Sequence, residues 1–171
     1  MHDDLMVYLK GLKKGNPGVF QGRILEYGSY DINGSCRHLF DTDEYIGVDH
    51  RPGPGVDVVT FMHSFNDEKG FDTIVTTSTL EHDPWWKFSL ERCVKLLKPG
   101  GNLIITTVGP GWPIHELEVA PIKNYYSGLD TFELSKTVLL ASRFRSSVIF
   151  DKDETNELYA HFLGKIQEAH P

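Results

Sequence analysis

The chain has few cysteines and lacks any long hydrophobic run. Its 171 residues contain only Cys36 and Cys93, which lie in different segments without a Cys-x-x-Cys or Cys/His ligand spacing. We therefore expect reduced structural thiols rather than a disulfide framework or a zinc site. No apolar segment approaches the about 20 residues that span a bilayer, and the acidic, amphipathic start differs from a secretory signal. These absences predict a cytoplasmic protein with no membrane partner.

Positive charge is also scarce. The chain carries 17 Lys and Arg against 24 Asp and Glu, a net charge of -7. A broad nucleic-acid surface needs clustered Lys and Arg, so this balance argues against one. The length and the 40% hydrophobic content fit one core, so we expect a single domain over residues 1–171. No inserted domain is predicted that would hold a protein or nucleic-acid substrate.

Hydrophobic patterning predicts alternating strands and helices in the first two thirds of the chain. Short β-branched segments bounded by Gly, Pro or charged residues predict strands at 23–27, 45–49, 56–59, 71–75 and 102–108. Apolar residues at helical spacing predict helices at 3–14, 35–40 and 84–98. This alternation is typical of an α/β fold with a Rossmann-like, doubly wound and mostly parallel sheet.

The last third departs from that alternation. A Gly/Pro-rich loop at 109–113 precedes a predicted helix at 132–142, and strands are predicted at 147–150 and 158–165. The polar residues between these two strands predict a solvated turn, so we expect a C-terminal antiparallel hairpin. The charged run 151–157 lacks the ligand spacing of a cation-binding loop, so no metal site is predicted.

The most informative residues lie where the first two predicted strands end. Glu26 and Gly28 end the first strand and open the next loop, and Asp49 ends the second strand 21 residues after Gly28. A glycine lets a cofactor approach the backbone, and a strand-end carboxylate accepts hydrogen bonds from ribose hydroxyls. Glu26 could instead cap the turn, although a buried charge is costly unless paired. Because Tyr30 stands where a dinucleotide-binding loop needs glycine, we expect a nucleoside without a diphosphate.

Four segments share a pattern with a known group of proteins. Residues Glu26–Ser35 match the motif Glu-x-Gly-Ser-x-Asp-x-Asn-Gly-Ser, and further similarity lies in Gly47–Val59, Thr79–Pro84 and Leu96–Gly101. With these motifs the chain resembles the class I S-adenosylmethionine-dependent methyltransferases, specifically the methyltransferase type 11-like family. The resemblance covers residues 23–108 and continues weakly to the end. It implies S-adenosylmethionine as cofactor and methyl transfer to an oxygen or nitrogen of a small-molecule or glycan acceptor.

The resemblance also implies which residues bind the cofactor. The set consists of Glu26 and Gly28 for the methionine part, Asp49 for the ribose, His50, Met62 and His63 around the adenine, and the neighbouring Tyr27, Ser29 and Thr77. Relatives usually carry an acidic residue near the start of 61–65 to meet the adenine amino group, whereas this chain has Phe61. Adenine recognition then rests on backbone groups or stacking.

Two histidines and two tyrosines are candidates for the acceptor side. His82 follows the fourth predicted strand and His115 follows the fifth, where open α/β sheets place ligands. Either is a candidate base for a hydroxyl acceptor, although His82 could instead cap the next helix and His115 could pack in its loop. Tyr125 and Tyr126 are candidates for a substrate lid, unless one of them simply packs.

Within the single domain we expect a helix and linker at 1–20, a cofactor-binding core at 23–108 and a substrate-side segment at 109–171. Trp85 and Trp86 are expected to pack the start of their helix against the sheet or a neighbouring subunit. Monomer and homodimer are both compatible with the sequence.

Two other functions stay open at this point. A non-catalytic binding or partner module could keep the same fold, and Phe61 and the small size are compatible with it. A nicotinamide dehydrogenase is a third candidate, and it would bind NAD. The segment from 109 onward carries no recognisable substrate motif.

Overall fold

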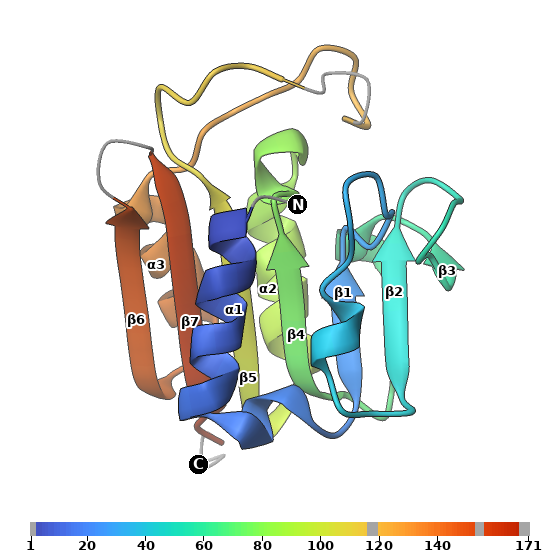
Figure 1. Cartoon of the computed structure of the whole chain (residues 1–171), viewed down its shortest axis with the longest axis vertical. Helices are drawn as coiled ribbons and strands as arrows, with labels where there is room; N and C mark the ends of the chain where they lie inside the picture. Colours follow the sequence, from blue (N-terminus) through green and yellow to red (C-terminus); the bar gives the residue numbers. More distant parts are fainter. Residues whose placement is uncertain (1–2, 116–119, 153–155, 168–171) are drawn as a thin grey trace.

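A seven-stranded mixed sheet forms the centre of the protein (Figure 1). The computed structural model describes residues 3–115, 120–152 and 156–167. The spatial order is β3-β2-β1-β4-β5-β7-β6, with bounds β1 Ile24–Tyr27, β2 Tyr45–Asp49, β3 Val58–Val59, β4 Phe71–Thr77, β5 Leu97–Val108, β6 Phe144–Lys152 and β7 Glu157–Lys165. Strands β1 to β5 pair in parallel, whereas β7 pairs antiparallel with both β5 and β6. The predicted Rossmann-like sheet with a C-terminal antiparallel hairpin is confirmed.

Helices lie on both faces of this sheet (Figure 1). Helix α1 (Asp3–Gly15) covers one face, and α2 (Trp86–Leu96) and α3 (Thr131–Ala141) cover the other. Within the described residues, four 3-10 helices occupy connections: η1 Pro17–Phe20, η2 Arg37–Leu39, η3 Met62–Ser64 and η4 Leu80–His82. None of the described helices is long and apolar enough to cross a membrane.

The strands are buried on both faces because successive side chains alternate between two hydrophobic clusters. In β5, Leu103 and Ile105 belong to the cluster under α2 and α3, whereas Ile104 belongs to the cluster under α1. A sheet covered on both faces requires near-continuous apolar strands, which explains the β-branched runs in the sequence. Cys36 and Cys93 are buried free thiols in these two clusters, as predicted.

The junction between α2 and β5 differs from the prediction. The helix predicted at 84–98 ends at Leu96, and β5 begins at Leu97, five residues earlier than predicted. Leu97 pairs with Phe71, and a register shift after this pair places Pro99-Gly100-Gly101 within the strand. Proline and glycine are tolerated there because a bulge does not require every ladder hydrogen bond.

The third strand is shorter than predicted. Only Val58–Val59 of the predicted strand 56–59 forms β3. The Asp57 carboxylate accepts a hydrogen bond from the Gly47 amide at 2.7 Å, so a side chain takes the place of a ladder carbonyl.

The remaining elements are found with small shifts. A single turn, η2, replaces the helix predicted at 35–40. Strands β6 and β7 are longer than the predicted 147–150 and 158–165. Residues 153–155 of the predicted charged turn lie outside the described residues.

The core supports a matched pair of truncations. Leu103 is fully buried, so Leu103→Ala should lower the free energy of unfolding by about 2–5 kcal/mol through lost burial and a residual cavity. Leu140 is 78% exposed, and Leu140→Ala should change it by less than about 0.5 kcal/mol. Urea unfolding of both variants measures the difference; equal losses would contradict the described core.

Candidate functional site

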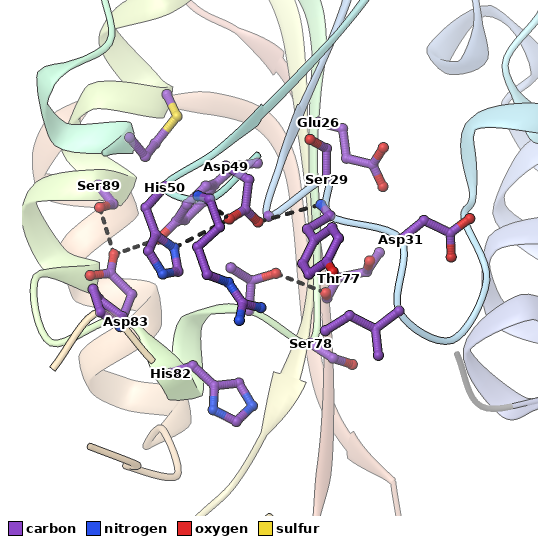
Figure 2. A pocket seen from close by; sticks show the side chains of 18 of the residues that line it. Glu26, Ser29, Asp31, Asp49, His50, Thr77, Ser78, His82, Asp83 and Ser89 are labelled. Carbon is purple, nitrogen blue, oxygen red and sulfur yellow. Dashed lines mark hydrogen bonds and ion pairs between the residues drawn. The ribbon is translucent and has the colours of Figure 1, made fainter. Parts of the chain in front are cut away.

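The carboxyl ends of β1, β2 and β4 open into a first pocket (Figure 2). All nine residues predicted to contact the cofactor line it: Glu26, Tyr27, Gly28, Ser29, Asp49, His50, Met62, His63 and Thr77. They come from three strand ends and from η3, which the parallel pairing brings to one edge of the sheet. The geometry therefore gathers the predicted set into one place.

The turn after β1 requires a glycine. Gly28 has φ +79, and a Cβ at this position would lie 2.0 Å from Oγ1 of Thr79. The amides of Gly28 and Ser29 both donate to the carbonyl of Val48, at 2.9 and 3.2 Å. Only a residue without a side chain lets the loop sit this closely between β2 and β4.

Asp49 is a hydrogen-bonded carboxylate at the end of β2 (Figure 2). Its Oδ1 accepts from the Arg51 amide at 3.0 Å and lies 3.2 Å from Nδ1 of His50, and Oδ2 accepts from the Tyr30 amide at 3.4 Å. Burial opposes ionisation, but the bonds from His50 and Arg51 hold the pKa of Asp49 below its usual value. Because a carboxylate has about four acceptor sites, Asp49 retains capacity for a ligand hydroxyl.

Glu26 is a carboxyl group buried in the sheet. It is 4% exposed, and the Cys36 thiol donates to its Oε1 at 3.4 Å. Burial raises the pKa of Glu26 to about 7, against hydrogen bonds from Tyr45 and Cys36 that lower it. A thiol is a weak donor, so a cationic ligand group would stabilise the charged form further.

An aromatic stack forms one wall of the first pocket. The Phe61 ring lies nearly parallel to those of His50 and His63, with centroids 5.9 and 5.5 Å away. Trp85 meets Phe61 and His63 with centroids 5.5 and 5.3 Å away, whereas Trp86 packs against the hydrophobic core. Phe61 is 41% exposed, so the residue that departs from the family pattern offers an accessible flat ring.

A second pocket adjoins the first over the end of β5. The two pockets lie side by side, because both are lined by Leu5, Asn33 and Ser78. The second pocket is further lined by polar and aromatic residues, among them Glu81, Thr106, Thr107, Trp112, His115, Glu157 and Tyr159. Among the described residues, the two pockets thus adjoin each other at the same edge of the sheet.

The two candidate histidines lie at the junction of these pockets. His82 lines the first pocket and His115 the second, and their ring centroids are 5.4 Å apart. Nδ1 of His115 lies 3.0 Å from the carbonyl oxygen of Pro113. Because a carbonyl only accepts, Nδ1 donates, and Nε2 of the neutral ring carries the lone pair.

The structure separates the two candidate tyrosines. The Tyr126 ring contacts both His82 and His115, with centroids 5.3 and 5.2 Å away. Burial and the charge of Glu81 raise the pKa of Tyr126, so its hydroxyl stays protonated. Neither Tyr125 nor Tyr126 is among the described residues that line either pocket.

Several site residues were missed by the sequence prediction. Tyr30 and Arg51 line the first pocket, with the guanidinium 4.8 Å above the ring. Asp83 also lines it and accepts hydrogen bonds from the hydroxyls of Tyr27 and Ser89 at 2.5 and 2.6 Å. Arg51 and Asp83 directly follow the predicted site residues His50 and His82, and this adjacency was the available signal.

Comparison with known proteins identifies the fold. No family model and no curated protein sequence matches the chain. A complex of DhpI with SAH is similar at TM-score 0.67 and 16% identity, over 94% of this chain and 85% of that chain. The N-methyltransferase NodS from Bradyrhizobium japonicum WM9, in complex with S-adenosyl-L-homocysteine (SAH), gives TM-score 0.63 and 16% identity, over 94% and 86%.

A third structure agrees with these two. The 1,6-didemethyltoxoflavin-N1-methyltransferase of Burkholderia thailandensis, solved with 1,6-didemethyltoxoflavin and S-adenosylhomocysteine, has TM-score 0.63 and 13% identity, over 94% of this chain and 78% of that chain. The chain therefore has the fold of the class I methyltransferases, as its motifs predict.

The buried carboxyl of Glu26 predicts a pH-dependent gain in stability on its removal. Its folded pKa of about 7 lies above the usual 4.5, so its ionisation destabilises the protein progressively as pH rises from 4.5 through 7. Glu26→Gln should therefore be more stable than wild type at pH 8, by up to about 3 kcal/mol, with the gain vanishing near pH 4.5. Urea unfolding at several pH values measures this gain. Glu68→Gln at an exposed position controls for the loss of one charge, and a pH-independent gain would contradict the assignment.

Proposed function

We propose that the chain binds S-adenosylmethionine in the first pocket and transfers its methyl group to a small-molecule or glycan acceptor in the second. The observation that carries this proposal is the convergence of all nine predicted cofactor contacts on one pocket that adjoins a polar second pocket. The fold supports it, because the structures with S-adenosylhomocysteine named above hold the product of such a reaction.

The residues of the first pocket fit the parts of this cofactor. The Asp49 carboxylate accepts hydrogen bonds of the kind that ribose hydroxyls donate. The Phe61 stack offers a flat ring to an adenine, and the buried Glu26 matches a cationic ammonium group. Gly28 leaves the backbone open to close approach.

The same loop disfavours a dinucleotide. Tyr30 stands at the position where a pyrophosphate-binding loop has its second glycine. Its ring fills the space beside Gly53, where an added Cβ would lie 2.0 Å from the ring carbon Cε2. The Arg51 guanidinium covers the ring. The loop therefore supports a nucleoside without a diphosphate rather than NAD.

The side chains at the junction of the pockets are placed to prepare the acceptor. When bound, the cofactor supplies a methyl group on a sulfonium, which leaves as a neutral thioether with little acid assistance. The protein's own contribution is to align the acceptor and, for a hydroxyl, to help remove its proton. Nε2 of His115 has a lone pair for that proton, and His82 lies in ring contact with it.

We assign the two sides of the site to two parts of one domain, 1–171. Residues 23–108 form the cofactor side, and 109–171 form the acceptor side together with the ends of β4 and β5. The N-terminal helix contributes Leu5 to the lining of both pockets.

Calorimetric titration with S-adenosylmethionine, S-adenosylhomocysteine and NAD tests the cofactor. We expect micromolar binding of the first two and none of NAD. Asp49→Ala removes a charged hydrogen-bond acceptor and should weaken S-adenosylhomocysteine binding by about 10–100-fold. Asp43→Ala, at an exposed position, should bind like wild type. Tighter binding of NAD, or an unaffected Asp49→Ala, would sink the cofactor assignment.

Turnover tests the two histidines. His82→Ala and His115→Ala should each lower the rate of S-adenosylhomocysteine release by about 100-fold or more, because the acceptor loses its route for proton removal. The assay offers a panel of polar small molecules and oligosaccharides to each variant. Rates within a few-fold of wild type would remove both histidines from the mechanism. Binding of the cofactor by wild type without transfer to any acceptor would favour a non-catalytic module.

A further inference from the structure

Three metal-ligating side chains meet at the junction of the two pockets. Glu81 and His82 belong to η4, and His115 belongs to the loop after β5. One potential ligand atom from each residue lies within 4.8 Å of the others. Glu81 is fully buried and His82 is 5% exposed, so this is not a surface cluster of acids.

Neighbouring groups orient two of these side chains. The Thr107 hydroxyl donates to Oε2 of Glu81 at 2.8 Å, and the amide of Ser127 donates to the Glu81 carbonyl at 2.8 Å. The Nδ1–H of His115 donates to the Pro113 carbonyl, which leaves Nε2 as the ligand atom. Metal-binding imidazoles are commonly fixed in this way, through a hydrogen bond from the other ring nitrogen to a carbonyl or carboxylate.

We propose that Glu81, His82 and His115 bind a divalent transition-metal ion whose open coordination positions face the second pocket. Two imidazoles and one carboxylate are a ligand set for such ions and leave positions for substrate or water. Metal–ligand bonds of about 2.0–2.2 Å hold ligand atoms about 3–4 Å apart, so movements of about 1 Å close this set. The charge of the ion also compensates the buried carboxylate.

The position of the ion defines the class of acceptor. Glu81 and His115 line the second pocket, and His82 lies at the edge of the first (Figure 2). An ion held between them binds oxygen donors, such as neighbouring hydroxyls of a polyol or sugar, beside the cofactor. A hydroxyl bound to it loses its proton to water more readily, while the electron pair stays on oxygen. This role for the acceptor rests on the proposed function, whereas binding of the ion does not.

The ligand set also changes the part played by the histidines. In this assignment both imidazoles act through the ion rather than as free bases. Tyr126 packs its ring against both of them and limits their movement on one side. The sequence predicts no metal site because His115 is 33 residues from His82, and only the folding of β5 beside β4 brings them together.

Titration of the untagged, chelator-stripped full chain with Co2+ tests the site through visible absorption and calorimetry. We expect one ion per chain, displaced by Zn2+. Glu81→Gln and His115→Ala should bind Co2+ at least about 10-fold more weakly. His38→Ala removes an exposed histidine far from the site in sequence and should match wild type. Acetate, a small oxygen donor, should shift the absorption of bound Co2+ if positions are open.

Several results overturn the proposal. One is that the wild-type chain does not bind one Co2+ ion per molecule. Another is that both Glu81→Gln and His115→Ala bind Co2+ as tightly as wild type. An absorption spectrum unchanged by acetate overturns the open positions. As a control for folding, each variant must unfold on heating in a cooperative transition near that of wild type. Glu81→Gln is used because glutamine has nearly the same size as glutamate and should leave the fold intact. A parallel titration with S-adenosylhomocysteine separates the two proposals. If the protein binds Co2+ but not S-adenosylhomocysteine, only the proposed function is overturned. If it binds S-adenosylhomocysteine but not Co2+, only the metal site is overturned.

Discussion

The site depends on the parallel pairing of β1 with β2 on one side and β4 on the other. Ile24 pairs with Tyr45 and with Thr73, so the three strands run in near register and end at the same level. The turn at Gly28 and the carboxylate of Asp49 consequently face the same space. A shift of one residue in either ladder would turn a strand's buried side chains to the opposite face of the sheet. The same hydrophobic alternation that fixes the core therefore fixes the first pocket.

The second pocket depends on a different set of contacts. β7 inserts antiparallel beside β5, and the amide of Gly109 donates to the Asn156 carbonyl at the end of this pair. The Leu129 amide donates a hydrogen bond to the carbonyl of Val108, and the Ser127 amide donates one to the backbone carbonyl of Glu81. These backbone bonds tie the segment after β5 to the edge of the sheet at both its ends. The second pocket is thus made by long-range pairing, whereas the first is made by consecutive strand ends.

This difference explains what the sequence revealed. The strands and the two-sided burial follow from local patterns, and so do Glu26, Gly28 and Asp49, which lie at recognisable strand ends. The other residues of the first pocket were implied by the resemblance to the methyltransferase family. The convergence of Glu81 with His115, and of Phe61 with Trp85, depends on how loops return across the sheet and leaves no local pattern. The strand pairing of Leu97 ahead of Pro99-Gly100-Gly101 was missed for a related reason: tertiary pairing overrode the turn propensity of these residues.

Three buried carboxyl groups line the first pocket. Asp83 is satisfied internally by two hydroxyls, and Asp49 is held ionised by bonds from its neighbours. Glu26 has a weak thiol donor, and its burial costs stability once it is ionised. Native proteins are stable by only about 5–15 kcal/mol, so this cost is a sizeable part of the total. In the proposed function, the ammonium group of the cofactor carries the opposite charge and offsets it. Of these three carboxyl groups, Glu26 is therefore the one whose ionisation should depend most on a cationic ligand.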